Sequence, residues 1–259
     1  MTPEIAAALL DLATSGGTAA FAVLLRVGAA MALLPAFGEA VLPVRLRLGL
    51  ALAFTAVVLP AVAPALAGLP AEGIGTVWLL TEPLAGLLLG IGLRLAVMAL
   101  QIAAAMAAQA MSLAQLFAGA GAEPQPAIGH LLTMGGLALA LMSGLPERLA
   151  RALILSYGVL PAGRMPDPGA VLDWGLAQTG AAFALAFALA LPFLLASLLY
   201  NLALGIINRA MPQLMVALVG APAMAAVGLG LVLLAAPAGL LVWRDMLDGL
   251  LADPFAVPP

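Results

Sequence analysis

The sequence contains no cysteine, no lysine and a single histidine, His130, among its 259 residues. Without cysteine the chain has no disulfide, no cysteine-ligated metal site and no thiol nucleophile. His130 stands in no HExxH motif, and no glycine-rich phosphate loop is followed by lysine. A hydrolase built on His130 and Ser143 would lack an orienting carboxylate. We therefore expect no catalytic residue, no metal and no cofactor.

Charge is also scarce: charged residues make up 8% of the chain, and the formal net charge is -3. A soluble domain needs about a quarter charged residues to cover its outside. The basic residues are all arginine and form no polybasic run, which argues against a nucleic-acid partner. Glu4 and Asp11 lie where a signal peptide would carry basic residues, so we expect no cleaved signal peptide.

Apolar residues dominate what is present, at 65% of the chain, and the mean hydropathy is +1.19. This composition predicts an all-α, multi-helix integral membrane protein with a single helical membrane domain over 1–259. About six apolar segments are expected, at 18–37, 44–66, 77–111, 127–145, 175–207 and 215–243. The third and fifth exceed the roughly 20 residues that cross a bilayer, so they tilt, break at Pro83 or Pro192, or extend beyond the lipid.

The connections between the segments do not determine the orientation of the chain in the membrane, because their arginines divide almost evenly between its two sides. Trp78, Trp174 and Trp243 each lie at a segment edge, where tryptophan commonly anchors a helix at the membrane surface. The longest connection has room for a short amphipathic helix around Arg148 to Tyr157.

The polar residues inside the apolar segments include Arg26 in the first, and Arg94 and Gln101 in the third. An arginine at bilayer depth costs about 3 kcal/mol unless it is paired or hydrated, so we expect all three to be buried against protein or to face water. Arg94 and Gln101 share one helix face, with Gln109 close to it. This stripe is either the lining of an aqueous path or a set of contacts within a bundle.

The stretch "GLLLG", from Gly86 to Gly90, has the spacing of small residues that lets two helix backbones approach closely. A contact within the chain and a contact between subunits both fit this spacing.

The stretch "LFAGAGAEPQPAIGH" after the third segment should be a loop. Its glycines leave the backbone conformationally free, and its prolines cannot continue a helix. It is unusually apolar for a solvated connection. Irregular backbone at membrane depth occurs only where protein encloses it or where it lines a water-filled cavity. An interfacial turn and a loop folded into a channel both remain open.

The stretch "NLALGIINRAMPQLMVALVGAP", residues 201–222, interrupts two apolar segments with polar residues. Arg209 should fall in the last helical turn, where its charge complements the carbonyl end, and Pro212 should stop the helix just beyond. Gly220 and Pro222 favour a bend early in the next segment. The stretch is either a plain hairpin tip or a hinge that contacts a neighbouring subunit.

These residues resemble a known family. "LALGIINRAMPQLMVALVGAP" closely resembles the signature of FliR, the R subunit of the flagellar type III protein export gate, and of its injectisome counterpart. Three further stretches agree in the same order: "RVGAAMALLPAFGEAVLPVRLRLGLALAFTAVVLP" from residue 26, "EPLAGLLLGIGLRLAV" from residue 82 and "SYGVLPAGR" from residue 156.

The resemblance implies a non-enzymatic gate component that forms the secretion pore with P and Q subunits, contacts the B-type switch subunit and passes unfolded proteins. It places the protein in the bacterial inner membrane, in the flagellar basal body, partly raised above the bilayer plane. It also implies a plug loop over Gln109, Met111, Ser112, Leu113, Leu116, Phe117, Gly119, Gly121 and Glu123. The hinge and subunit contact would be Asn208, Arg209, Pro212, Gln213, Gly220 and Pro222.

Two other classes also fit a multispanning apolar chain. A small-molecule transporter or permease would explain Arg26 and Arg94, but it predicts an inverted repeat or a midplane site, and no convincing repeat is visible. A structural membrane scaffold would share the packing features and need no plug. Co-purification with P-like and Q-like partners separates the gate component from both.

Overall fold

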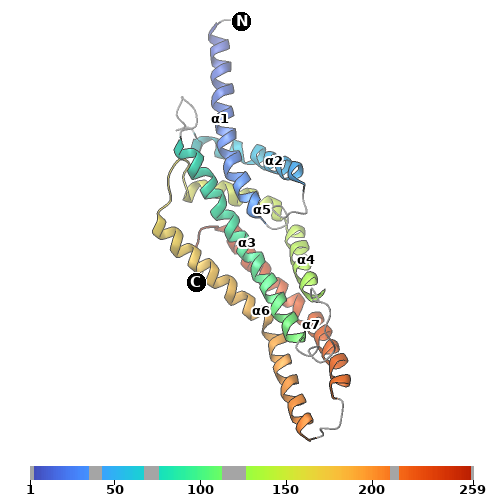
Figure 1. The fold of residues 1–259 in the computed structure, drawn as a ribbon. Coiled ribbons are helices and arrows are strands. Elements are labelled where there is room, and N and C mark those ends of the chain that lie inside the picture. Colours follow the sequence, from blue (N-terminus) through green and yellow to red (C-terminus); the bar gives the residue numbers. More distant parts are fainter. Residues whose placement is uncertain (1–2, 35–42, 67–75, 113–126, 211–215, 258–259) are drawn as a thin grey trace. The chain divides into compact units, whose positions relative to one another are not determined.

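A computed structural model describes residues 3–34, 43–66, 76–112, 127–210 and 216–257 (Figure 1). Within these ranges the chain is helical and has no strand. The elements are α1 (Pro3–Leu33), α2 (Val44–Val62), the 3-10 turn η1 (Ala63–Leu66), α3 (Thr76–Ser112), α4 (Ala127–Met142), α5 (Leu145–Val159), α6 (Pro168–Ala210) and α7 (Val216–Ala252). The predicted all-α integral membrane fold is confirmed.

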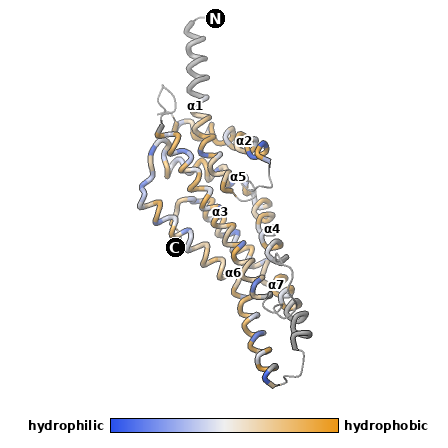
Figure 2. The backbone as a smooth tube through the Cα atoms, in the orientation of Figure 1, coloured by the Kyte–Doolittle hydropathy of each residue, from blue (hydrophilic) through white to orange (hydrophobic). Residues whose placement is uncertain are grey.

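Four of the described helices are long and apolar enough to cross a membrane. Their apolar stretches are Val44–Leu66, Val77–Ala110, Pro168–Ile207 and Ala226–Ala252. The first and fourth predicted segments correspond to shorter apolar stretches, Gly17–Leu33 and Leu131–Met142. Figure 2 shows hydrophobic residues along most of the helical length, whereas the connection between α5 and α6 is more hydrophilic.

The helix α5 occupies the place where the sequence predicts a short amphipathic helix. It begins after Gly144, which has the left-handed φ of 82°, and carries a proline in its first turn. Its buried residues recur every three or four positions, as expected for a helix with one face on a core. They are Leu145, Leu149, Ala152, Leu153, Ser156 and Tyr157.

The chain divides into two compact units, and each is described by itself. The first unit comprises residues 1–95, 144–178 and 247–259, and the second comprises residues 96–143 and 179–246. The prediction of one helical membrane domain over 1–259 stays a prediction.

In the first unit, α1 packs against α2, and α2 packs against α5. The start of α3 approaches α1 through Gly86 and Gly90. A Cβ atom on Gly86 would lie 2.0 Å from the carbonyl oxygen of Arg26, and one on Gly90 would lie 2.8 Å from that of Ala30. Only glycine fits at such distances, so the "GLLLG" stretch makes a contact within the chain.

The second unit is held mainly by small and apolar residues from α3, α4, α6 and α7. Gly136 on α4 lies against Leu100, Leu240 and Trp243. Two side chains add hydrogen bonds between helices: Trp243 Nε1 donates to the carbonyl oxygen of Ala96 at 2.7 Å, and Ser197 Oγ donates to that of Ala110 at 2.8 Å.

Two of the three tryptophans are core residues rather than surface anchors. Trp174 and Trp243 are buried, and each indole N–H donates to a backbone carbonyl, of Pro254 and Ala96 respectively. A buried tryptophan needs such a partner because burial removes the water that would otherwise accept a hydrogen bond from its N–H. The expectation that these two tryptophans are interfacial anchors is therefore wrong for the chain itself.

Candidate functional site

The main polar feature of the first unit is a buried ion pair between Arg26 on α1 and Glu82 on α3. Arg26 Nε lies 2.9 Å from Glu82 Oε2, and the side chains are 1% and 0% exposed. A buried charge is tolerated only where it is paired and hydrogen-bonded. The surrounding helices supply the remaining partners.

Each of the two Nη atoms of the Arg26 guanidinium donates one hydrogen bond to an acceptor from α5 or its end. Nη1 donates to Ser156 Oγ at 3.0 Å, and Nη2 donates to the carbonyl oxygen of Leu160 at 3.0 Å. The guanidinium carbon also lies 3.6 Å from the centre of the Tyr157 ring, which stabilises the cation through the ring's negative face. Ser156 Oγ in turn donates a hydrogen bond to the carbonyl oxygen of Leu153 at 2.6 Å.

The Glu82 carboxylate uses its second oxygen to hold the connection between α5 and α6. Glu82 Oε1 accepts a hydrogen bond from the backbone N–H of Gly163 at 3.1 Å. Gly163 has a left-handed φ of 70°, and a Cβ there would lie 2.7 Å from Trp78. Glycine is therefore required by both conformation and space.

We call Arg26, Glu82, Ser156, Tyr157 and Gly163 the Arg26 cluster. Burial raises the pKa of the Tyr157 phenol, the Arg26 charge opposes that rise, and the Glu82 charge adds to it, so the phenol stays neutral. The cluster ties α1, α3 and α5 to the following connection with paired charges. Its arrangement is suited to fixing the helices rather than to exchanging protons.

Of the three polar residues predicted to be buried, the chain buries Arg26 alone. Arg94 and Gln101 are exposed on α3, as is Gln109, so the expectation that Arg94 and Gln101 are buried against protein or face water stays a prediction. The physical reason is that α3 buries one face, and these residues lie on the face that no described part of the chain covers.

Sequence reasoning missed four members of the Arg26 cluster, although a signal for them exists. The stretches quoted for the family resemblance begin at Arg26, Glu82 and Ser156, and the third contains Tyr157 and Gly163. An acidic residue is one of the partners that an intramembrane arginine commonly has. Glu82 is the acidic residue that opens the long third segment, which makes it the natural candidate.

The predicted plug residues lie mostly outside the described residues. Gln109 is an exposed residue of α3, and Met111 and Ser112 form the end of that helix. The other predicted plug residues, Leu113, Leu116, Phe117, Gly119, Gly121 and Glu123, fall in 113–126, which the structure does not describe.

The predicted hinge residues are described in part. Asn208 and Arg209 belong to the last turn of α6, which ends at Ala210, and Arg209 is exposed. Pro212 and Gln213 lie outside the described residues. Gly220 and Pro222 lie within α7, which begins at Val216 and continues through both.

Comparison with known proteins identifies the class. The chain matches the family model described as bacterial export proteins, family 1, over residues 18–250. It is 29% identical over 230 residues to the flagellar biosynthetic protein FliR of Caulobacter vibrioides (strain ATCC 19089 / CIP 103742 / CB 15), with 86% of this chain and 90% of that protein covered.

The fold and this match define an all-α integral membrane protein of bacterial protein export. The chain belongs to the bacterial export proteins, family 1, and is a component of the flagellar type III export apparatus. The resemblance predicted from its sequence is confirmed.

Proposed function

We propose that the chain is the R-type subunit of the flagellar export gate and forms the secretion pore together with P-type and Q-type subunits. In this proposal it has no enzymatic activity, contacts a B-type switch subunit, and passes unfolded proteins across the bacterial inner membrane. The family match over residues 18–250 supports the role in export.

The observation that carries the proposal is the exposure of Arg94 and Gln101 on α3. Both lie in a stretch, Val77–Ala110, that is long and apolar enough to cross a membrane. Lipid cannot solvate a guanidinium, and an arginine at bilayer depth costs about 3 kcal/mol or more. In this proposal the exposed face of α3 meets water or another chain, as it would in a pore built from several subunits.

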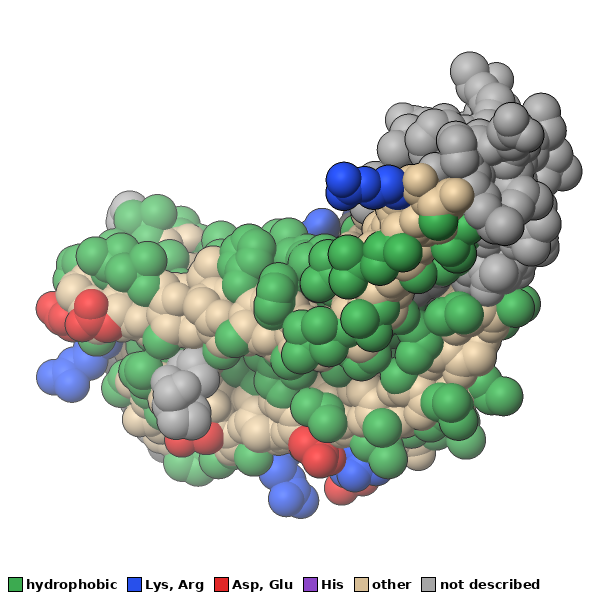
Figure 3. Space-filling model, turned by 90° about the horizontal axis from the view of Figure 1, so that it is seen from below, with side chains coloured by type: hydrophobic (Ala, Val, Ile, Leu, Met, Phe, Trp, Pro, Cys, Tyr) green, Lys and Arg blue, Asp and Glu red, His purple; other side chains and the backbone are tan. Residues whose placement is uncertain are grey.

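The exposed apolar surface of α6 and α7 supports the same proposal. Within the most apolar windows of Pro168–Ile207 and Ala226–Ala252, 28% and 11% of the residues are buried inside the chain. Figure 3 shows one face of the molecule covered largely by hydrophobic side chains, with few charged groups. Lipid or partner helices must cover such a surface.

The finer parts of the predicted site belong to this proposal. The segment that follows Gln109 would block the path until a substrate displaces it, and the end of α6 at Arg209 would contact a neighbouring subunit. Part of the assembled protein would rise above the bilayer plane, which would explain why α6 is longer than the roughly 20 residues needed to span it.

Co-purification tests the proposal directly. The tagged full-length chain should bring down P-type and Q-type subunits from membranes, and Arg94→Leu should reduce their yield because it removes a polar contact. Met98→Leu, an exposed apolar change on the same helix, is the matched control. If the face met lipid, Arg94→Leu would instead preserve or raise the yield, and the proposal would fail.

Two variants test the proposed plug loop and the proposed subunit contact at Arg209 separately. Deleting residues 113–121 should increase ion leakage through the assembled gate, and an unchanged leak would remove the plug assignment. Arg209→Glu should reduce assembly and motility. Normal assembly and motility in that variant would favour a plain hairpin tip.

A further inference from the structure

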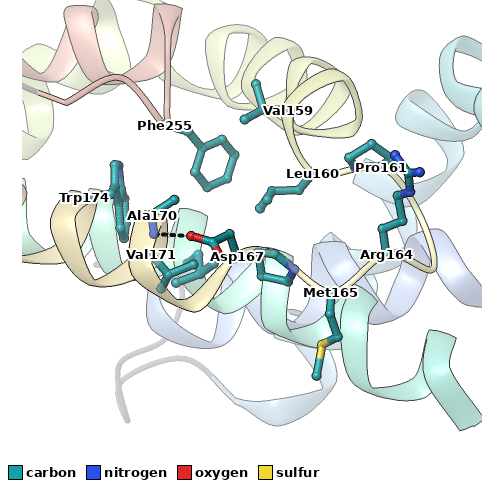
Figure 4. A pocket seen from close by; sticks show the side chains of 12 residues that line it. Val159, Leu160, Pro161, Arg164, Met165, Asp167, Ala170, Val171, Trp174 and Phe255 are labelled. Atoms are coloured by element: carbon teal, nitrogen blue, oxygen red, sulfur yellow. Dashed lines mark hydrogen bonds between the residues drawn. The ribbon is translucent and has the colours of Figure 1, made fainter.

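The first unit contains a cavity of about 380 Å³ that neither the Arg26 cluster nor the proposed function uses. It lies between the end of α5, the first turns of α6 and the C-terminal tail. Figure 4 shows Phe255, Val159 and Leu160 directed into one space, with Trp174 at one side of it and Arg164 at the other. A volume of this size is within the range of small-molecule sites, about 300–1,000 Å³.

The walls of the cavity are fixed in position. Trp174 Nε1 donates to the carbonyl oxygen of Pro254 at 3.2 Å, and Gln178 Nε2 donates to that of Ala256 at 3.2 Å. The Phe255 ring packs against Trp174 with the ring centres 5.9 Å apart. On the opposite wall, Leu160 is held by Arg26. The cavity is therefore a formed pocket with an apolar interior.

Two opposite charges stand in the lining of this pocket. The Arg164 guanidinium makes no hydrogen bond or ion pair within the part of the chain that the structure describes. Asp167 Oδ2 accepts the backbone N–H of Ala170 at 2.8 Å, at the start of α6, and its Oδ1 has no partner among the described residues. One cation and one carboxylate oxygen are thus available beside an apolar space.

This arrangement matches an amphiphile whose head carries both charges. The lining of the pocket includes the first turns of α6, where its long apolar stretch begins, and lipid headgroups lie at the ends of membrane-spanning stretches. We propose that the pocket binds one phospholipid with a zwitterionic, primary-amine headgroup. An acyl chain would lie in the apolar space beside Phe255, Val159 and Leu160 (Figure 4), the phosphate would meet Arg164, and the ammonium would donate to Asp167.

The headgroup chemistry makes the proposal selective. Arginine binds phosphate through charge-assisted hydrogen bonds, so any phospholipid gains from Arg164. Only a primary amine gives Asp167 a hydrogen-bond donor with a positive charge. A trimethylated amine has no N–H, and a glycerol headgroup has no positive charge, so phosphatidylethanolamine should bind better than phosphatidylcholine or phosphatidylglycerol.

Native mass spectrometry of the full-length chain, released from detergent with each of these three lipids added, tests the proposal. We expect one tightly retained phosphatidylethanolamine. Ala170→Trp should fill the pocket and abolish retention, whereas Leu172→Trp, which is exposed on α6 outside the lining, should not. Equal retention in wild type and Ala170→Trp would overturn the proposal.

Charge variants test the headgroup contacts. Arg164→Gln should weaken retention of all three lipids by about tenfold, because a hydrogen bond to a charged group is lost. Asp167→Asn keeps an oxygen for the α6 N-terminus but should remove the preference for phosphatidylethanolamine. Arg151→Gln, an exposed arginine of α5 outside the pocket, is the control. Retention that is equal for the three lipids in wild type would contradict the headgroup assignment.

A partner subunit is the competing occupant. If Ala170→Trp leaves lipid retention unchanged but prevents co-purification of other export subunits, the pocket receives a side chain from a partner and the lipid proposal is wrong. If it abolishes lipid retention while the subunits still co-purify, the proposal stands.

Discussion

The two compact units of the chain are stabilised by different interactions. The first contains the buried Arg26–Glu82 pair and an ion pair between Arg148 on α5 and Asp248 on α7. Among the described residues of the second, the ion pair is between the sequence neighbours Arg244 and Asp245 at the surface. Its helices are otherwise joined by apolar packing and by hydrogen bonds to backbone carbonyls.

This difference separates a region whose helix positions are specified by paired charges from one whose helices are joined mainly by apolar packing. Paired buried charges demand one geometry, because any displacement leaves a charge without a partner. Apolar packing is less directional. Both units still leave apolar helix surface uncovered, because 22% of the most apolar window of Val44–Leu66 is buried inside the chain, against 28% for Pro168–Ile207 and 11% for Ala226–Ala252.

The largest expected effect comes from breaking the Arg26 cluster. Arg26→Ala leaves Glu82 buried without a counter-charge and should lower the free energy of unfolding by about 3–5 kcal/mol. The measurement is denaturant or thermal unfolding of the purified chain in detergent. Arg151→Ala, which removes an exposed arginine from α5, is the control and should change stability by less than about 0.5 kcal/mol.

The double variant Arg26→Leu with Glu82→Leu sharpens this result. Replacing a buried pair by apolar residues of similar volume is often neutral or stabilising, so the double variant should recover most of the stability lost in Arg26→Ala. If both variants are equally destabilised, the loss comes from packing volume and not from an unpaired charge.

Two phenylalanines of α6 test the second unit by the same kind of contrast. Phe193 is 2% exposed and Phe187 is 55% exposed. Phe193→Ala should cost about 3–5 kcal/mol of stability because it opens a cavity. Phe187→Ala should leave the unfolding of the isolated chain nearly unchanged but reduce its association with partner subunits, measured by co-purification. Normal association in Phe187→Ala would assign this surface to lipid.

How far the sequence predicts the fold depends on which force sets each feature. Apolar run length predicts the helices well, because a chain of this composition must bury its backbone polar groups in helices. The amphipathic spacing of Leu149, Leu153 and Tyr157 likewise predicts α5. These are local signals, and the structure confirms them.

The candidate site is less predictable because its contacts are distant in sequence. The cost of an intramembrane arginine predicts that Arg26 needs a partner, but Glu82 lies 56 residues away, and no local pattern joins the two. The same argument finds no partner for Arg94 among the described residues, because none of them covers its face of α3. Trp174 and Trp243 are likewise predicted to be surface anchors because they lie at the ends of apolar segments, but both are buried.

A smaller effect is expected at the close approach of α1 and α3. Gly86→Ala would place a Cβ 2.0 Å from a backbone oxygen and should destabilise the first unit by about 1–3 kcal/mol through overpacking. Gly28→Ala is a matched control on α1, where a Cβ meets nothing within 4 Å. It should stabilise the chain by about 0.5–1 kcal/mol, since alanine favours the helix. Two changes of the same sign would contradict the packing role assigned to Gly86.

The smallest effect is expected at the hydrogen bond between α6 and α3 in the second unit. Ala110 is in the last turn of α3, where carbonyl groups have no helical partner, and Ser197 Oγ satisfies this one. Ser197→Ala should cost about 0.5–1.5 kcal/mol in unfolding measurements. Ser143→Ala is the control, because Ser143 Oγ bonds to Leu139 in its own chain segment and joins no second helix. Should the two serine variants be equally mild, hydrogen bonding would add nothing specific to the second unit, and its helices would be held by apolar packing alone.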